Sequence, residues 1–274
     1  EQTYTVNVPY TEEMTGSRTV QKRVPVQSSK TVQVRGGHWV TEQVEVASGE
    51  QLRRARELAG GRPLFGAGLS LGGTILLNAC LDGGASPPLD SLVCVSSPLD
   101  LERCAWQIER PRNRIYKRWL LQRLVAQTLA DPFGVSEEER EALAGHGPLG
   151  PMESIRAFDG AITAPRWGYR SVDHYYREAS PLQRLQAYLE DSRFSAPSQL
   201  PPTLVVHAID DPWVPVAAAQ ALAALNLPGV EVLLTAAGGH NGFHARCDGR
   251  GGDPGNWGDR LTARWFARLL ADQA

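Results

Sequence analysis

The chain has 274 residues, which is enough for one large domain or two small ones. Hydrophobic residues make up 42% and charged residues 21%, and the formal net charge is −2, so composition gives no electrostatic case for binding nucleic acid or an anionic membrane. No run of about 18 apolar residues is present, so we expect no transmembrane segment.

The start of the chain and its cysteines bear on where the protein works. The chain begins with Glu1, so we expect a fragment or a processed form, and no secretory signal is visible. The cysteines lack metal-type spacing and lie in or beside apolar segments, which favours buried free thiols: Cys80, Cys94, Cys104 and Cys247. Free thiols indicate a reducing compartment, and we expect a cytoplasmic protein.

Residues 1–48 differ from the rest of the chain. Apolar and polar residues alternate there, as in Tyr4–Val8, and this period of two is typical of half-exposed antiparallel strands. Pro9 and Pro25 restrict such strands to sheet edges or strand ends. We predict an extended β segment of strands or hairpins outside the main sheet.

The same segment repeats itself. Thr-Val and Val-Pro units recur at Thr5–Tyr10, Thr19–Val26 and Thr31–Val34. Together with Gly37–Glu42, these units resemble the YTV-type repeats of planctomycete surface or secreted proteins. The resemblance implies an interaction module and a cell-surface or secreted location, which competes with the cytoplasmic expectation.

The next stretch predicts a helix, a strand and a sharp turn. Glu50–Ala59 is typical of a short helix, and Pro63–Ala67 of a short buried strand. Gly68-x-Ser70-x-Gly72 follows and leads into a second helix. A serine at such a turn has a strained backbone, and glycines at 68 and 72 avoid crowding between turn and helix. The N–H group of Leu71, at the helix N-terminus, is the natural first donor to an oxyanion.

The remainder predicts an α/β fold. Three apolar runs are typical of buried parallel strands, at 90–96, 202–208 and 230–236, and helices are expected at 216–225 and 261–270. Residues 100–190 contain helical segments such as 114–129 and 137–143 but no clear strand, which indicates a helical cap insertion. We therefore predict a mostly parallel sheet with helices on both faces.

Three reactive side chains stand at the ends of these predicted strands, in the order Ser70, Asp211, His240. A serine hydroxyl needs a base within hydrogen-bond reach, and the base needs an acid to fix its tautomer. Asp210 is the rival acid, but the spacing from Asp211 to Val214 favours Asp211. We expect Asp210 to cap the following turn.

Motifs from about residue 50 to the end resemble YheT-type α/β-hydrolases: Gly68–Gly73, Arg114–Tyr116, Asp173–Tyr176, Ala179–Pro181, Pro202–Pro212 and Gly238–Phe243. The resemblance implies a serine esterase or acyltransferase acting on medium- or long-chain acyl esters, with no metal or organic cofactor. Carried over by motif, Ser70 is the nucleophile, Asp211 the acid and His240 the base. The substrate is then a small-molecule acyl ester.

The chain departs from that family before Ser70. The family places four strands and a helix ahead of the nucleophile strand, with a second oxyanion donor in a His-Gly loop. Only about twenty residues separate Ser48 from Ser70, and Gly36–His38 has the reverse order. We therefore predict a partial α/β-hydrolase fold over residues 49–274, with a flat apolar edge exposed at Leu64–Ala67.

Three functions follow as hypotheses. The first is hydrolysis of carboxylic esters through an acyl-enzyme, weakened by the missing strands. The second is a non-catalytic chimera with a surface-repeat interaction module, and the third is acyl transfer to alcohols. Other residues have structural roles or are left open: His207 in the core, His244 at the surface, Ser96 and Ser97 in a turn, and Tyr175 and Tyr176 in an acyl pocket or in core packing.

Overall fold

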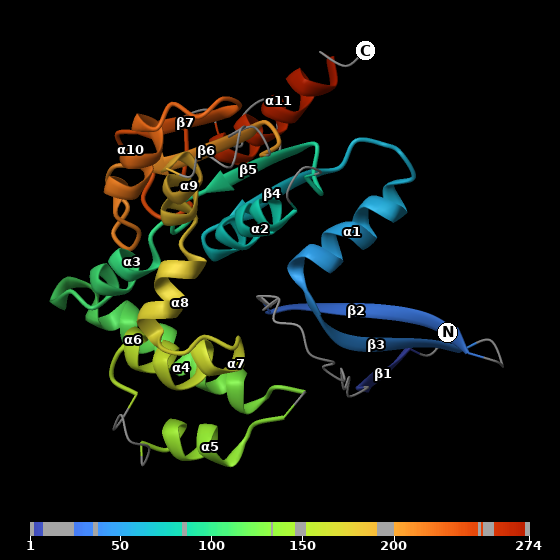
Figure 1. Cartoon of the computed structure of the whole chain (residues 1–274), viewed down its shortest axis with the longest axis vertical. Helices are drawn as coiled ribbons and strands as arrows, with labels where there is room; N and C mark the ends of the chain where they lie inside the picture. Colours follow the sequence, from blue (N-terminus) through green and yellow to red (C-terminus); the bar gives the residue numbers. More distant parts are fainter. Residues whose placement is uncertain are drawn as a thin grey trace.

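The structure is a computed structural model of the chain. It describes residues 3–7, 25–34, 38–83, 87–132, 134–145, 152–190, 200–245, 248 and 255–271. The strands of these residues form two separate sheets, one of three strands and one of four (Figure 1). No helix in this part of the chain is long and apolar enough to cross a bilayer.

The N-terminal sheet contains β1 (Thr3–Asn7), β2 (Pro25–Val34) and β3 (His38–Ala47) in the order β1-β3-β2. Strands β2 and β3 form an antiparallel hairpin, with Pro25 opposite Ala47 and Val34 opposite His38. Strand β1 is parallel to β3, so the expected antiparallel pairing holds for the hairpin alone. Because β1 lies on the other side of β3 from β2, the hairpin turn does not set its direction. The repeat unit at 19–24 lies outside the described residues.

The second sheet is entirely parallel, in the order β4 (Phe65–Leu69), β5 (Ser91–Val95), β6 (Thr203–Ala208) and β7 (Val230–Thr235). All six side chains of β6 and all five of β5 are buried, as expected for central parallel strands. The register places Leu69 opposite Val95 and Ala208 opposite Thr235. The carboxyl ends of the strands therefore form one edge, from which four loops emerge.

Helices cover both faces of this sheet. One core cluster joins the sheet to α2 (Leu71–Asp82), α9 (Pro181–Glu190) and α10 (Val216–Ala224) through residues such as Leu77, Leu92, Leu182 and Leu222. On the other face, Val93, Val206 and Phe243 pack with Trp265 of α11 (Trp257–Ala271). Helix α1 (Ser48–Ala59) links β3 of the first sheet to β4 of the second.

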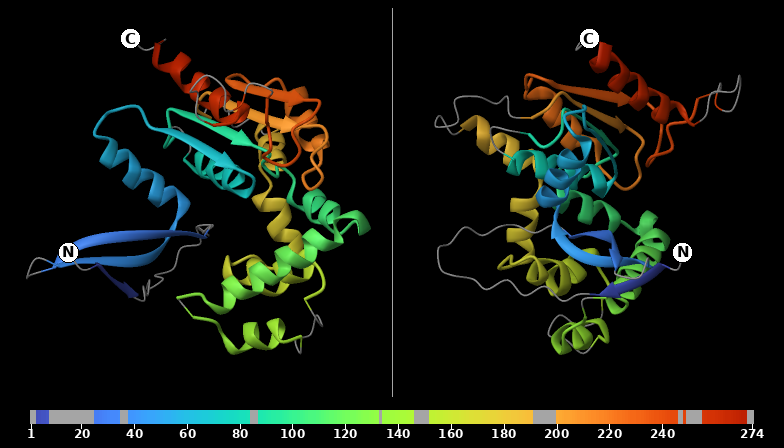
Figure 2. Two further views of the ribbon diagram at one scale, coloured as in Figure 1. Left: turned by 180° about the vertical axis from the view of Figure 1, so that it is seen from behind. Right: turned by 90° about the vertical axis from the view of Figure 1, so that its right-hand side faces the viewer.

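The chain between β5 and β6 forms a group of helices with its own core. The group contains α3 (Leu101–Ile108), α4 (Arg114–Leu129), α5 (Glu137–Leu143), α6 (Ile155–Phe158), α7 (Ala164–Arg166), α8 (Val172–Ala179), a 3₁₀ turn at Pro111–Asn113 and a π turn at Asp159–Thr163. Figures 1 and 2 show this group below the sheet, whereas α11 lies above it. Helices α4 and α5 have the bounds that the sequence predicts.

Strand β4, which leads to Ser70, lies at the edge of the four-stranded sheet. Leu69 and Leu71 are exposed there, although both side chains are large and apolar. A β-strand edge with unpaired backbone groups and apolar side chains is a site for pairing with another strand. The sequence predicts the apolar edge at Leu64–Ala67, but Leu64 and Phe65 are half-buried, because Leu64 packs on the core and Phe65 stacks on Phe266. The exposed apolar side chains lie further along, at the end of β4 and the start of α2.

Candidate active site

The turn after β4 has a backbone that few residues adopt. Ser70 has φ 51° and ψ −128°, and it directly precedes α2. Its N–H group donates to the carbonyl of Val95 at 2.8 Å, and its own carbonyl accepts from the N–H group of Gly73 at 3.1 Å. These bonds hold a strained residue with its side chain beyond the carboxyl edge of the sheet.

Two glycines make this turn possible, and the sequence predicted one of the two. A Cβ atom on Gly68 would lie 2.4 Å from the Cα of Gly73, as expected from the sequence. A Cβ atom on Gly72 would have no atom within 4 Å, so the prediction of crowding at Gly72 is wrong. Gly73 is the second close approach, since a Cβ atom there would lie 2.0 Å from the Oγ of Ser97.

This difference gives a matched test. We expect Gly73→Ala to lower the free energy of unfolding by about 1–3 kcal/mol, because a buried position has no room for the methyl group. Gly72→Ala should leave stability unchanged or slightly raise it, because alanine favours a helix and the space is open. Chemical denaturation of both variants measures the effect. Equal stability of the two variants would contradict the packing of the turn.

His240 joins the serine to a carboxylate. Its Nε2 lies 2.9 Å from the Oγ of Ser70, and its Nδ1 lies 2.9 Å from Oδ2 of Asp211. The side chain of Asp211 is fully buried and that of His240 nearly so. The network assigns a proton to Nδ1, which donates to the carboxylate, and leaves Nε2 to accept from the serine hydroxyl.

The structure separates the two candidate acids. Asp211 contacts the imidazole, whereas Oδ1 of Asp210 accepts the N–H group of Gly239 at 2.8 Å. The turn that Asp210 was expected to cap is capped by Asp211 itself: its Oδ1 accepts the N–H groups of Trp213 and Val214, each at 2.9 Å. Asp211 therefore holds its own loop and orients His240, while Asp210 holds the loop that carries His240.

The loop that carries His240 is fixed by contacts that sequence reasoning missed. The carbonyl of Gly238 accepts the N–H groups of Gly242 at 3.0 Å and Phe243 at 3.3 Å. Ser96, fully buried with φ 49°, accepts the N–H group of Asn241 on its Oγ at 3.2 Å. Ser96 lies at a strand end as expected, but its hydroxyl also holds the loop. A serine directly after a buried strand was the available signal.

An aromatic stack borders the imidazole. The ring of Trp213 lies 4.8 Å from that of His240, and the ring of Tyr116 from α4 stacks on Trp213 at 3.6 Å. Trp213 closes one side of the histidine, and Tyr116 connects that side to the helical insertion. Tyr116 lies in the Arg114–Tyr116 motif and Trp213 directly follows the Pro202–Pro212 motif, but no spacing in the sequence predicted that they would meet.

The other candidate residues lie in structural roles. Nε2 of His207 donates to the carbonyl of Val214 at 3.0 Å, and burial lowers the pKa of the ring, so it is neutral. In the described part of the chain its Nδ1 has no hydrogen-bond partner. His244 is exposed beside Asp248. The hydroxyl of Tyr176 donates a hydrogen bond to Asp159. Tyr176 and Tyr175 pack together in the core of the helical insertion and not around an open pocket.

The electrostatics of the turn suit an anion. The first turn of α2 contains no acidic residue, so the partial positive charge of the helix N-terminus is not offset beside Ser70.

Three cysteines are free and buried: Cys80, Cys94 and Cys104. Burial raises the pKa of the Cys104 thiol to about 12. Cys247 lies outside the described residues. Among the described residues, no group of three or more His, Cys, Asp or Glu has the arrangement of a metal site.

Comparison with known proteins identifies the family. Residues 45–246, more than half of the chain, match the family of the alpha/beta hydrolase fold, so the chain belongs to the α/β-hydrolases. This match, with the parallel sheet and its flanking helices, confirms the predicted fold class. The resemblance to YTV-type repeats stays a prediction, as do the domain boundaries at 48 and 49.

Individual relatives support the same family, and the match covers only part of the length of each relative. YheT of Escherichia coli (strain K12), which carries the name of an esterase, is 33% identical over 165 residues, 58% of this chain and 43% of that protein. Phospholipase ABHD3 of Mus musculus is 30% identical over 160 residues, 58% of this chain and 35% of that protein. The YheT-type resemblance is thus confirmed, and the chain spans less than half the length of these relatives.

A solved structure also aligns over most of the chain. Alpha/beta hydrolase domain-containing protein 10 from mouse covers 87% of this chain and 80% of its own, with a TM-score of 0.39 and 15% identity.

Proposed function

We propose that the chain hydrolyses carboxylic esters through an acyl-enzyme, with Ser70 as nucleophile, His240 as base and Asp211 as the acid that orients it. The observation that carries the proposal is the continuous hydrogen-bonded series from Asp211 through His240 to Ser70, with 2.9 Å at each step. Membership of the α/β-hydrolases and the similarity to YheT support the same chemistry. The substrate class is a small-molecule acyl ester.

The proposed reaction follows from these contacts. As the Ser70 oxygen attacks the acyl carbonyl carbon, its proton passes to Nε2 of His240, and the carbonyl oxygen becomes an oxyanion. The buried Asp211 carboxylate stabilises the imidazolium. Collapse of the tetrahedral intermediate breaks the ester bond, and His240 gives the proton to the departing alcohol. Water, activated by His240, then attacks the acyl-serine and releases the carboxylic acid.

The oxyanion needs preorganised donors. We assign the N–H group of Leu71 as the first donor, because it begins α2 directly after Ser70 and the first N–H groups of a helix lack partners within the helix. Gly36 and Gly37, which stand before His38 in the order opposite to that of the family's His-Gly loop, lie outside the described residues. Loss of one oxyanion donor costs about 10²–10³ in rate, so we expect slow turnover.

The test is reaction of the chain with a fluorophosphonate probe, followed by hydrolysis of a short-chain nitrophenyl ester. We expect slow covalent labelling, mapped to the peptide with Ser70, and kcat/KM below about 10⁴ M⁻¹s⁻¹. Efficient turnover would show that the second donor is present. No labelling of a folded chain would favour the non-catalytic hypothesis.

Hydrolysis and transfer share the acyl-enzyme and differ in the acceptor. Adding an alcohol to the ester assay and measuring the ratio of new ester to acid separates them. Acyl transfer to alcohols, the interaction role of the N-terminal segment and the cytoplasmic location stay predictions.

A further inference from the structure

Helix α4 exposes three large apolar side chains along one stripe of its surface. Ile115 is 78% exposed, Trp119 51% and Leu129 49%. Ile115 and Trp119 are four positions apart, and exposed Gln122 and Ala126 continue the same face towards Leu129. The opposite face, with Leu121, packs into the core of the helical insertion. The stripe is therefore a second apolar face that the described part of the chain leaves uncovered.

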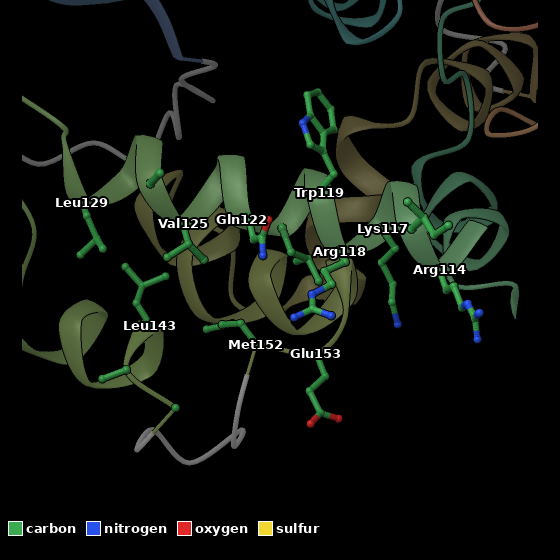
Figure 3. A pocket seen from close by; sticks show the side chains of 15 residues that line it. Arg114, Lys117, Arg118, Trp119, Gln122, Val125, Leu129, Leu143, Met152 and Glu153 are labelled. Atoms are coloured by element: carbon green, nitrogen blue, oxygen red, sulfur yellow. The ribbon is translucent and has the colours of Figure 1, made fainter. Parts of the chain in front are cut away.

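A groove of about 1290 Å³ runs beside this stripe (Figure 3). At one end, Figure 3 shows Val125, Leu129, Leu143 and Met152 gathered together. At the other end lie Arg114, Lys117 and Arg118, also among the lining residues. The groove is thus apolar at one end and cationic at the other.

The charges around the stripe are mostly positive. Residues 110–130 contain six Arg or Lys and no Asp or Glu, although the whole chain has a net charge of −2. Lys117 forms an ion pair with Glu109, and the guanidinium of Arg123 lies 5.8 Å from the Trp119 ring. Arg114 and Arg118 are exposed, and the acid lining the groove is Glu153. Cations therefore outnumber acids on this surface.

We propose that α4 docks on an anionic lipid bilayer and lies in the plane of the lipid headgroups. A helix with exposed Trp and Ile on one stripe and arginines beside it matches the chemistry of interfacial helices. The stripe would enter the boundary between headgroups and acyl chains, while Arg114, Arg118 and Arg123 would meet lipid phosphates. A nucleic acid would match the cations but leave the stripe in water. The exposed apolar side chains therefore favour a lipid bilayer as the partner.

The position of α4 gives this docking a consequence for the site. Tyr116, on the same helix, stacks on Trp213, which borders His240. A chain docked through α4 would hold its serine site close to the lipid surface. The docking itself needs no turnover, so it stands or falls separately from the proposed ester hydrolysis.

The test is flotation of the chain with vesicles of phosphatidylcholine containing phosphatidylglycerol, and with vesicles of phosphatidylcholine alone. We expect binding to the anionic vesicles that weakens with added salt. Arg114→Gln with Arg118→Gln should lower the partition coefficient about 25-fold, since each cation near an anionic surface contributes about fivefold. Ile115→Ala with Trp119→Ala should lower it about tenfold or more.

Helix α1 provides matched controls. Leu58 is 77% exposed, close to the value of Ile115, and Arg53 and Arg54 are exposed neighbours. Leu58→Ala, and Arg53→Gln with Arg54→Gln, should leave binding within about twofold, and circular dichroism checks that every variant folds. Equal losses from the α1 and α4 variants, or no binding to anionic vesicles, would overturn the proposal. A dimer that the α4 variants dissociate, without vesicle binding, would overturn it in favour of a second copy covering the stripe.

Discussion

Replacing Ser70 by alanine is expected to abolish fluorophosphonate labelling and to lower ester hydrolysis by about 10³-fold or more. In the described part of the chain, the Ser70 hydroxyl is the one that lies within hydrogen-bond distance of the imidazole of His240. Without it, His240 and Asp211 keep their contact but have no nucleophile to activate. The rate of labelling, followed by mass spectrometry, is the primary measurement, because it does not depend on a complete oxyanion hole.

Ser97→Ala is the control for this change. Ser97 is buried beside the same turn, and its hydroxyl donates to the carbonyl of Val95 at 3.4 Å, not to His240. We expect this variant to be labelled at close to the parent rate. Equal hydrolysis by the Ser70→Ala variant and the parent chain would remove Ser70 from the mechanism.

The four-stranded sheet was predictable because its strands are short apolar runs between turn residues. The central strands are predicted at 90–96 and 202–208 and observed at Ser91–Val95 and Thr203–Ala208. A buried parallel strand carries this signal in every residue, since both of its faces are covered. The parallel pairing of β1 with β3 was not predictable, because alternation reports which side chains face the same way and not which strand lies alongside.

The site was predictable to the level of strand ends and, through the spacing to Val214, to Asp211 as the carboxylate beside His240. Parallel strands bring their carboxyl ends together, so residues after three such strands were expected to meet. Whether Gly72 or Gly73 makes the close approach, by contrast, depends on the direction of a single Cβ atom in the first turn of α2. Sequence spacing does not define that direction. Sequence spacing likewise could not predict the stack of Tyr116 on Trp213, since one ring lies on α4 and the other in the loop after β6.

Net charge was a poor guide to the surface. A value of −2 for the whole chain predicts no anionic partner, yet residues 110–130 carry six cations without an acid. Screening confines the effect of a surface charge to roughly 10 Å, so a membrane would meet the local patch and not the average. At α4 we therefore expect the local charge, and not the net charge of the chain, to govern contact with an anionic surface.

Asp211→Asn is expected to lower the rate of labelling and of ester hydrolysis by about 10⁴-fold while leaving the fold intact. Oδ1 of Asp211 accepts the N–H groups of Trp213 and Val214, and an amide oxygen can accept both. That orientation turns the amide NH₂ towards Nδ1 of His240, which must then accept a hydrogen bond. The ring proton moves to Nε2, and Nε2 can no longer take the proton of Ser70.

Asp210→Asn distinguishes this tautomer effect from a general loss of charge. Asp210 adjoins Asp211, and its Oδ1 accepts the N–H group of Gly239, a bond that an asparagine oxygen keeps. Both variants remove one negative charge from the same loop, but only Asp211→Asn changes the hydrogen-bond partner of His240. We expect Asp210→Asn to keep activity within about threefold, since its carboxylate is not hydrogen-bonded to the imidazole. Similar losses in both variants, with unchanged thermal stability, would mean that the charge of the loop, and not the tautomer of His240, governs the reactivity of Ser70.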